Sequence, residues 1–196
     1  MNAKPRVLVF AGSIRSGSLN RKLARAAAAA LERQGLEVTL ADLRDYPMPI
    51  YDGDLEASAG LPAPAKAFKD LVRSHDAVAI ASPEYNGSFA ALLKNAIDWA
   101  TRPEPGEPRL AAFQGKTALL MSASPGQFGG QRGLRHVREL LEMIHVKTLP
   151  AQLTLGNAGA AFDADGRLVR AEDRAALDRL AEDLARALQA GSSAAA

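Results

Sequence analysis

A loop rich in hydrogen-bond donors occupies residues 12–20, with the sequence GSIRSGSLN. Its donors are three serine hydroxyls and one guanidinium, from Ser13, Ser16, Ser18 and Arg15. Asn20 stands at the start of a predicted helix, where free backbone N–H groups and the positive end of the helix dipole attract anions. A terminal phosphate has three oxygens that need many donors. The loop is therefore typical of a monophosphate site.

Two common nucleotide-binding loops do not match these residues. Gly12 and Gly17 have the spacing of a Walker A loop, but Ser18 stands where that loop needs lysine. Ile14 replaces the second glycine of a dinucleotide GxGxxG motif. The remaining alternative is a serine-capped turn in which the two glycines serve only the backbone angles.

A second unusual loop covers residues 83–88, with the sequence PEYNGS. Backbone amides in such a loop can bind the edge of a flat heterocycle, because proline restricts the chain and glycine permits close approach. Tyr85 offers a ring face or a hydroxyl. The candidate contacts are Pro83, Glu84, Tyr85, Asn86 and Gly87. The alternative is a rigid turn in which Ser88 caps the next helix.

A third loop covers residues 124–131, with the sequence SPGQFGGQ. It begins at Ser124 and contains three glycines that allow the chain to bend around a bound ring. We expect it to form a wall of the same site. A mobile surface loop is the alternative, since glycine suits both.

The composition excludes several kinds of chemistry. The chain has no cysteine, so thiol nucleophiles, iron–sulfur clusters, cysteine-bound zinc and disulfides are ruled out. Its three histidines, His75, His136 and His145, match no metal-ligand spacing and are expected at the surface or at helix ends. No metal site and no catalytic side chain are predicted.

Strands and helices alternate along the chain. Strands are predicted at 6–11, 37–42, 77–82, 116–123 and 146–155, and the runs at 6–11 and 77–82 are apolar enough to be fully buried. Helices are predicted from about residue 20 to 34 and at 63–74, 89–101, 134–144 and 172–190, with Ser88 as the cap of the third. Strands that are apolar on both faces indicate a parallel sheet with helices on each side.

This alternation predicts the α/β class, as a doubly wound three-layer α/β/α sandwich. Its five-stranded parallel sheet has the expected order 2-1-3-4-5. We expect one domain over residues 1–190, followed by a disordered tail at 191–196. The connections Leu43–Pro62 and Arg102–Gly115 are long, so they are expected to be functional loops or disordered.

The topology brings the unusual loops together. In an open α/β sheet the ligand lies beyond the carboxyl ends of the strands, where the strand order reverses. In the order 2-1-3-4-5 that point lies between the first and third strands. The loops that leave these strands are Gly12–Asn20 and Pro83–Ser88. Topology and composition therefore select the same place.

The sequence resembles the NADPH-dependent FMN reductase family, flavodoxin-like flavoproteins that include quinone, azo-dye and chromate reductases. GSIRSGSLNRKLA at residues 12–24 is similar to the family's phosphate loop GSxRxxSxN. PEYNGSFAALLKNAIDWATRP at residues 83–103 is similar to its flavin-ring motif PEYNxSxxxxLKNAIDWxSRP. Phe89, Ala90 and Thr101 depart from that motif, which affects acceptor preference rather than flavin binding.

The resemblance implies specific flavin contacts. It assigns the FMN phosphate and ribityl chain to the residues Ser13, Arg15, Ser18, Leu19 and Asn20. It places the isoalloxazine ring against the second loop, from Pro83 to Gly87, and against Ser124. The flavin N5 would then accept hydride, so no catalytic side chain is needed.

The activity implied is an NAD(P)H-dependent FMN oxidoreductase. It would transfer two electrons by ping-pong kinetics, with NADPH or NADH as co-substrate, to quinones, azo compounds, chromate or free flavin. The alternative is a flavodoxin-type FMN electron carrier without nicotinamide oxidation. Such carriers are expected to be strongly acidic, whereas the net charge here is +2. A receiver-like signalling module would need acidic residues where Ala11, Gly12, Ser82 and Pro83 stand.

Partners follow from charge and from the resemblance. The small net charge, without a block of like charges, argues against nucleic acid. The N-terminal apolar run is far shorter than the roughly 20 residues of a membrane span, so we expect a cytoplasmic protein and no membrane partner. The resemblance implies a homodimer or homotetramer. Its contacts are expected in the segment Leu43–Pro62, and Lys94, Asn95 and Asp98 are expected to be either solvated or at this contact.

Overall fold

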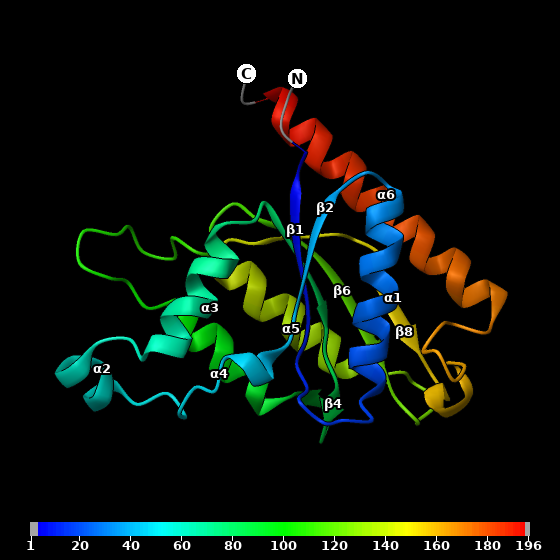
Figure 1. The fold of residues 1–196 in the computed structure, drawn as a ribbon, viewed down its shortest axis with the longest axis horizontal. Coiled ribbons are helices and arrows are strands. Elements are labelled where there is room, and N and C mark those ends of the chain that lie inside the picture. Colours follow the sequence, from blue (N-terminus) through cyan, green and yellow to red (C-terminus); the bar gives the residue numbers. More distant parts are fainter. Residues whose placement is uncertain (1–3, 195–196) are drawn as a thin grey trace.

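The computed structural model describes residues 4–194 and contains one parallel sheet with helices on both faces (Figure 1). The sheet strands are β1 (Arg6–Ala11), β2 (Glu37–Ala41), β3 (Ala77–Ala81), β6 (Thr117–Ala123), β7 (Lys147–Thr148) and β8 (Leu153–Leu155). The helices are α1 (Leu19–Arg33), α2 (Gly53–Ala59), α3 (Ala63–Arg73), α4 (Ala91–Ala100), α5 (Gln131–Met143) and α6 (Ala171–Ala194). The α/β fold class predicted from the alternation is confirmed.

The strand order is β2-β1-β3-β6, and β7 and β8 share the next position beside β6. The predicted order is therefore confirmed, but the predicted fifth strand at 146–155 is divided. Thr117 and Ala118 pair with β7, whereas Met121 begins the pairing with β8. Pro150 lies in the gap, and proline cannot donate a ladder hydrogen bond.

Both faces of the central strands β1, β3 and β6 are buried, and successive side chains of each strand point to opposite faces. In β1, Val7 and Val9 pack against α1 and α6, whereas Leu8 and Phe10 pack against α3, α4 and α5. Figure 1 shows these two helix layers on either side of the strands. The two apolar layers fix the sheet between them and hold the carboxyl ends of the strands at one edge.

The helix expected at 89–101 begins two residues later and is not capped by Ser88. Ala91 opens α4, and Ala90 occupies the cap position without a side-chain hydrogen bond. Ser88 and Phe89 instead form the strand β5 (Ser88–Phe89), which pairs with β4 (Glu84–Tyr85) in an antiparallel hairpin. The prediction failed because it assigned the hairpin's second strand to the helix.

The segment 43–62 is ordered by contacts within the chain. It contains a short 3-10 helix at Leu43–Asp45 and the helix α2. The carbonyl oxygen of Pro49 accepts hydrogen bonds from the Asn95 side chain and from the Trp99 ring N–H, each at 2.8 Å. The expectation that Asn95 is solvated or at a subunit contact is therefore wrong, because its side chain is buried against this segment.

The loop 102–115 is tied to α3 by ion pairs. Glu104 accepts a hydrogen bond of 2.7 Å from Lys66, and Glu107 pairs with the buried Lys69 and with Arg73. Two elements far apart in sequence are thereby joined on the outer side of the α3 layer.

The remaining helix and strand ends lie within three residues of the predicted ones, apart from the end of α6. This helix continues through Ala194, so residues 191–194 are helical and do not belong to a disordered tail. Residues 195–196 of that predicted tail lie outside the described residues.

His75 lies just after the end of α3, which is one of its two expected positions, and it is buried rather than at the surface. Its Nδ1 is 2.7 Å from the Leu71 carbonyl oxygen, and its Nε2 is 2.8 Å from the Thr39 hydroxyl. Nδ1 must donate to the carbonyl, so Nε2 accepts from Thr39 when the ring is neutral. Burial, with the nearby charges of Arg6 and Lys116, lowers the pKa of His75 despite the Leu71 bond and Asp76.

This environment predicts a loss of stability in acid. Because its pKa is lowered in the folded state, His75 binds a proton more tightly in the unfolded chain. The contribution of neutral His75 to the unfolding free energy is complete above the ordinary histidine pKa of about 6.5 and is lost as the pH falls below that value. We expect the difference in unfolding free energy between the wild type and His75→Gln to fall between about pH 7.5 and pH 5. Urea denaturation at each pH measures it, and a constant difference would contradict the assignment.

Candidate functional site

The first and second loops start side by side at the edge of the sheet. Ala11, the last residue of β1, is paired with Ala81 of β3, and the Gly12 N–H donates to the Ala81 carbonyl oxygen at 2.9 Å. A Cβ atom at Gly12 would lie 3.5 Å from the ring of Pro83 and 3.0 Å from the Leu93 Cβ. Glycine at position 12 therefore leaves room for Leu93 of α4, and the start of the second turn lies within van der Waals range of this position, as the topology predicts.

The first loop keeps its backbone donors unused. Within the described part of the chain, the N–H groups of residues 13–17 donate no hydrogen bond. Ser13 and Ser18 are buried, whereas Arg15 and Ser16 are exposed. Ser18 caps α1 by accepting a hydrogen bond of 3.3 Å from the Arg21 N–H, and its own hydroxyl hydrogen stays available. This arrangement is suited to an anion in front of α1.

Asn20 joins the first loop to the end of β6. Its side-chain amide donates to the Ala123 carbonyl oxygen, and its side-chain oxygen accepts from the Ala123 N–H, both at 2.9 Å. Asn20 is buried, so these two bonds fix the start of α1 against the end of β6. The Asn20 side chain therefore positions the start of α1. Leu19, beside it, packs against the core on the α1 side of the sheet.

The second loop is a tight hairpin. Its turn residues Asn86 and Gly87 both have positive φ, 51° and 77°, as in a type I′ turn. Glu84 anchors the hairpin, because its carboxylate accepts a hydrogen bond of 2.9 Å from the Gly133 N–H in the first turn of α5. Tyr85 is 57% exposed. The hairpin is therefore a rigid platform that presents Tyr85 to solvent.

The third loop is packed against the segment that follows β8. A Cβ at Gly129 would lie 2.8 Å from the Gly156 nitrogen, and one at Gly156 would lie 2.2 Å from the Gln127 carbonyl oxygen. The Ser124 N–H donates to the Leu155 carbonyl oxygen at 3.0 Å, and the Ser124 hydroxyl accepts from the Gly126 N–H at 3.2 Å. These contacts favour a fixed wall over a mobile loop.

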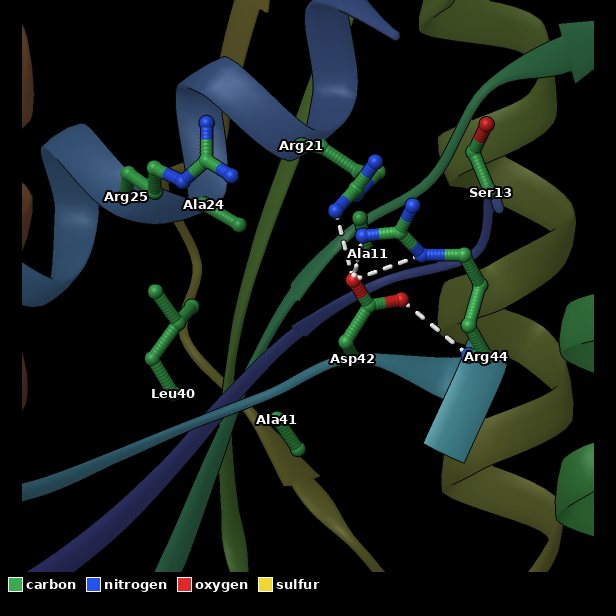
Figure 2. Close-up of a pocket in the computed structure, with 9 residues that line it drawn as sticks. All are labelled: Ala11, Ser13, Arg21, Ala24, Arg25, Leu40, Ala41, Asp42 and Arg44. Atoms are coloured by element: carbon green, nitrogen blue, oxygen red, sulfur yellow. Dashed lines mark hydrogen bonds and ion pairs between the residues drawn. The ribbon is translucent and has the colours of Figure 1, made fainter. Parts of the chain in front are cut away.

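Two polar groups and one hairpin at this site were not expected from the sequence. Asp42, directly after β2, is paired with Arg21 and Arg44 beside Ser13 (Figure 2). The Ser122 hydroxyl in β6 is buried and has no hydrogen-bond partner among residues 4–194. The β4–β5 hairpin was also missed, although its Asn-Gly dipeptide is a strong hairpin signal. An acidic residue at the end of a predicted strand is the signal that would have found Asp42.

The part of the chain that the structure describes contains no metal-binding cluster at this site. Among residues 4–194, no group of His, Asp and Glu side chains could hold a metal ion. His136 is exposed and lies 3.0 Å from the Ser88 hydroxyl through its Nδ1, whereas His145 is exposed after α5. No helix in this range is long and apolar enough to cross a bilayer. This edge of the sheet therefore contains three parts: the first loop, whose N–H groups at residues 13–17 are free within the described part of the chain and which we call the cradle, the rigid β4–β5 hairpin, and the third loop, which we call the wall.

Comparison with known families gives one extensive match. The model of the NADPH-dependent FMN reductase family matches residues 5–160. An NAD(P)H-dependent FMN reductase of Pseudomonas aeruginosa is 41% identical over 165 residues, covering 84% of each chain. A quinone reductase of Pseudomonas putida is 37% identical over 163 residues, covering 83% of each chain.

Solved structures agree with this match. FerB of Paracoccus denitrificans, a flavoenzyme NAD(P)H:(acceptor) oxidoreductase, superposes with a TM-score of 0.79 at 29% identity, over 93% of this chain and 96% of its own. A flavodoxin from the domain Archaea superposes with a TM-score of 0.64 at 13% identity, over 94% of this chain and 99% of its own. The second likeness concerns the fold alone and identifies it as flavodoxin-like.

The Asn20 bridge can be tested by stability. Asn20→Ala would leave the buried N–H and carbonyl of Ala123 without partners, which costs about 1–3 kcal/mol of unfolding free energy. Ser16→Ala, at an exposed position of the same loop, is the matched control and should change stability by less than about 0.5 kcal/mol. Urea denaturation of both variants measures the difference. Equal stabilities would show that the bridge does not hold α1 against β6.

Proposed function

The chain belongs to the NADPH-dependent FMN reductase family and is an oxidoreductase. We propose that it binds FMN at the sheet edge where the loops 12–20, 83–88 and 124–131 lie. We propose that it takes electrons from NADPH or NADH and transfers them to small acceptors, namely quinones, azo compounds, chromate or free flavin. The region involved is part of a single domain over residues 1–190.

The observation that carries this proposal is the unused donor set of the first loop beside the hairpin. Five consecutive residues, 13–17, have backbone N–H groups without partners within the described range, and they directly precede the start of α1. Gly12 adjoins Pro83, so the hairpin begins next to this cradle. A mononucleotide with a phosphate at one end and a flat ring at the other fits such a pair of subsites.

When bound, FMN supplies the redox chemistry, because its ring accepts hydride from a nicotinamide and returns two electrons to an acceptor. The residues of the first loop bind and orient. Arg15, which is exposed, contributes a positive charge, and Ser13 and Ser18 contribute buried hydroxyl donors. Leu19 and Asn20 complete this end of the proposed site.

The hairpin and the third loop provide the ring end of the proposed site. Positive φ at Asn86 and Gly87 turns the chain sharply, so Pro83, Glu84 and Tyr85 stand on a fixed backbone. Glu84 holds this backbone through Gly133. Ser124, whose backbone is held by hydrogen bonds with Leu155 and Ala158 at the start of the third loop, is the proposed contact of the ring from that loop. Backbone N–H groups held in this way stabilise negative charge on a ring at little reorganisation cost.

The site has one open approach in this proposal, used in turn by the nicotinamide and the acceptor, which gives ping-pong kinetics. The proposal also includes a homodimer or homotetramer, as the resemblance implies, and a location in the cytoplasm. Ile50, 77% exposed in the segment 43–62, is the apolar side chain there that is available for such a contact. Sedimentation velocity that shows only a monomer would overturn this part.

A visible spectrum tests the central proposal. We expect the purified protein, mixed with FMN and filtered, to retain flavin absorbance in equimolar amount. Addition of NADPH under nitrogen should bleach it, and addition of a quinone should restore it. Retained flavin that NADPH does not bleach would support the electron carrier. Folded protein that takes up no flavin would overturn both functions.

Arg15 tests the phosphate end of the site. Arg15→Gln removes a charged donor, so the Kd for FMN should rise about tenfold, whereas the Kd for riboflavin, which lacks the phosphate, should not change. Arg33→Gln removes the same charge from the far end of α1 and is the matched control. Flavin fluorescence titration measures each Kd. Equal losses for FMN and riboflavin would place Arg15 away from the phosphate.

A further inference from the structure

A pocket lies beside the first loop, between α1 and the carboxyl end of β2 (Figure 2). Its volume is about 240 Å³, and its polar lining comes from Ser13, Arg21, Arg25, Asp42 and Arg44. Of the residues proposed to bind FMN, Ser13 alone lines this pocket. The pocket therefore adjoins the FMN phosphate cradle without being part of the ring site.

The lining carries an excess of positive charge. Arg21 from α1 and Arg44 from the segment after β2 both donate to the same Asp42 oxygen, at 2.5 and 2.7 Å. Arg25 stands one turn after Arg21 and forms no hydrogen bond or ion pair with any residue in 4–194. Three guanidiniums against one carboxylate leave a net charge of +2 around the pocket.

This charge persists at neutral pH. Burial opposes ionisation of Asp42, but hydrogen bonds from Arg44 and the charge of Arg21 outweigh it and lower the pKa of the carboxyl. Asp42 thus stays ionised and holds Arg21 and Arg44 in place. Arg25 keeps its charge without a protein partner, so an anion that enters the pocket can pair with it.

The position of Asp42 points to a ribose. In βαβ units that bind dinucleotides, phosphate lies at the start of the first helix. A carboxylate at the end of the second strand accepts from the ribose 2′-hydroxyl of NAD, or an arginine nearby binds the 2′-phosphate of NADP. Asp42 and Arg44 supply both kinds of side chain here. β1, α1 and β2 have this arrangement here, with the cradle before α1 and Asp42 directly after β2. The first loop lacks the dinucleotide glycines, so the likeness lies in the placement of groups and not in the motif.

We propose that this pocket binds the phosphorylated ribose of an adenine nucleotide, with Asp42 at a ribose hydroxyl and Arg25 and Arg44 at the phosphate. The inference rests on the proposed function, which supplies two sources of this chemistry. One is the 2′-phosphorylated end of NADPH. The other is the adenylate half of FAD, bound with its FMN half in the cradle.

Binding of fragments tests the pocket without turnover. The probes are adenosine 2′,5′-bisphosphate and 5′-AMP, titrated by calorimetry into the FMN-loaded protein. Arg25→Gln should raise the Kd for the probe that binds by about tenfold, because a charged hydrogen bond is lost. Arg33→Gln should leave it unchanged, since Arg33 lies outside this pocket. Arg25 has no partner to strand, so its variant should fold, and a thermal melt checks this.

Two further measurements identify the source. The pocket is assigned to NADPH if Arg25→Gln weakens binding of the bisphosphate but not of 5′-AMP. In that case the KM for NADPH should also rise about tenfold, while the KM for NADH does not change. The pocket is assigned to the flavin dinucleotide if Arg25→Gln weakens binding of 5′-AMP. In that case the apoprotein of the variant should also bind FAD, but not FMN, more weakly. Arg44→Gln should reproduce either pattern.

The outcome that overturns the inference is distinct from failure of the proposed function. If neither probe binds, or if Arg25→Gln leaves both unchanged while FMN is retained and bleached by NADPH, the pocket is not a ribose phosphate site and the proposed function stands. If the protein takes up no FMN, the proposed function fails. The same titrations on the apoprotein then decide the pocket independently.

Discussion

The parallel register of β1, β3 and β6 is the constraint on which the site depends. It places Ala11 beside Ala81, and Ala81 beside Met121, so the three loops that follow leave the sheet at one edge. The register is fixed because both faces of these strands are buried, and a shift of one residue would turn every side chain to the wrong layer. The positions of the phosphate cradle, the hairpin and the wall therefore follow from the packing of the core.

The sequence predicts the architecture well because the burial pattern is strong. The runs at 6–11 and 77–82 are apolar on both faces, which only a covered strand explains, and the order of the strands follows from right-handed crossovers. The juxtaposition of Gly12 and Pro83 followed from that order alone. The identity of a ligand at this edge does not follow from topology, since one fold supports many functions. The resemblance of two motifs, with the family match, was needed for that.

What the sequence could not predict depends on contacts between distant residues. Asn95 is polar and stands beside the apolar stripe of α4, yet it is buried, because the Pro49 carbonyl 46 positions earlier accepts its hydrogen bond. Periodicity assigns such a residue to solvent because it contains no information on the segment that covers the helix. The sequence also does not show why a glycine is needed at a given position, as Gly129 and Gly87 illustrate. Gly129 is required by the close approach of Gly156, whereas Gly87 has open space and needs only its positive φ.

Asp42 gives the arginines beside the cradle a fixed geometry. A free arginine loses side-chain entropy when it binds an anion, which offsets part of the binding energy. Arg21 and Arg44 have already lost that freedom, because both are held by one Asp42 oxygen, and Arg21 also lies 3.4 Å from the Arg15 carbonyl oxygen of the first loop. An anion at this edge then meets oriented donors. The carboxylate thus reduces the net charge of the pocket, but it lowers the entropic cost of using the charge that remains.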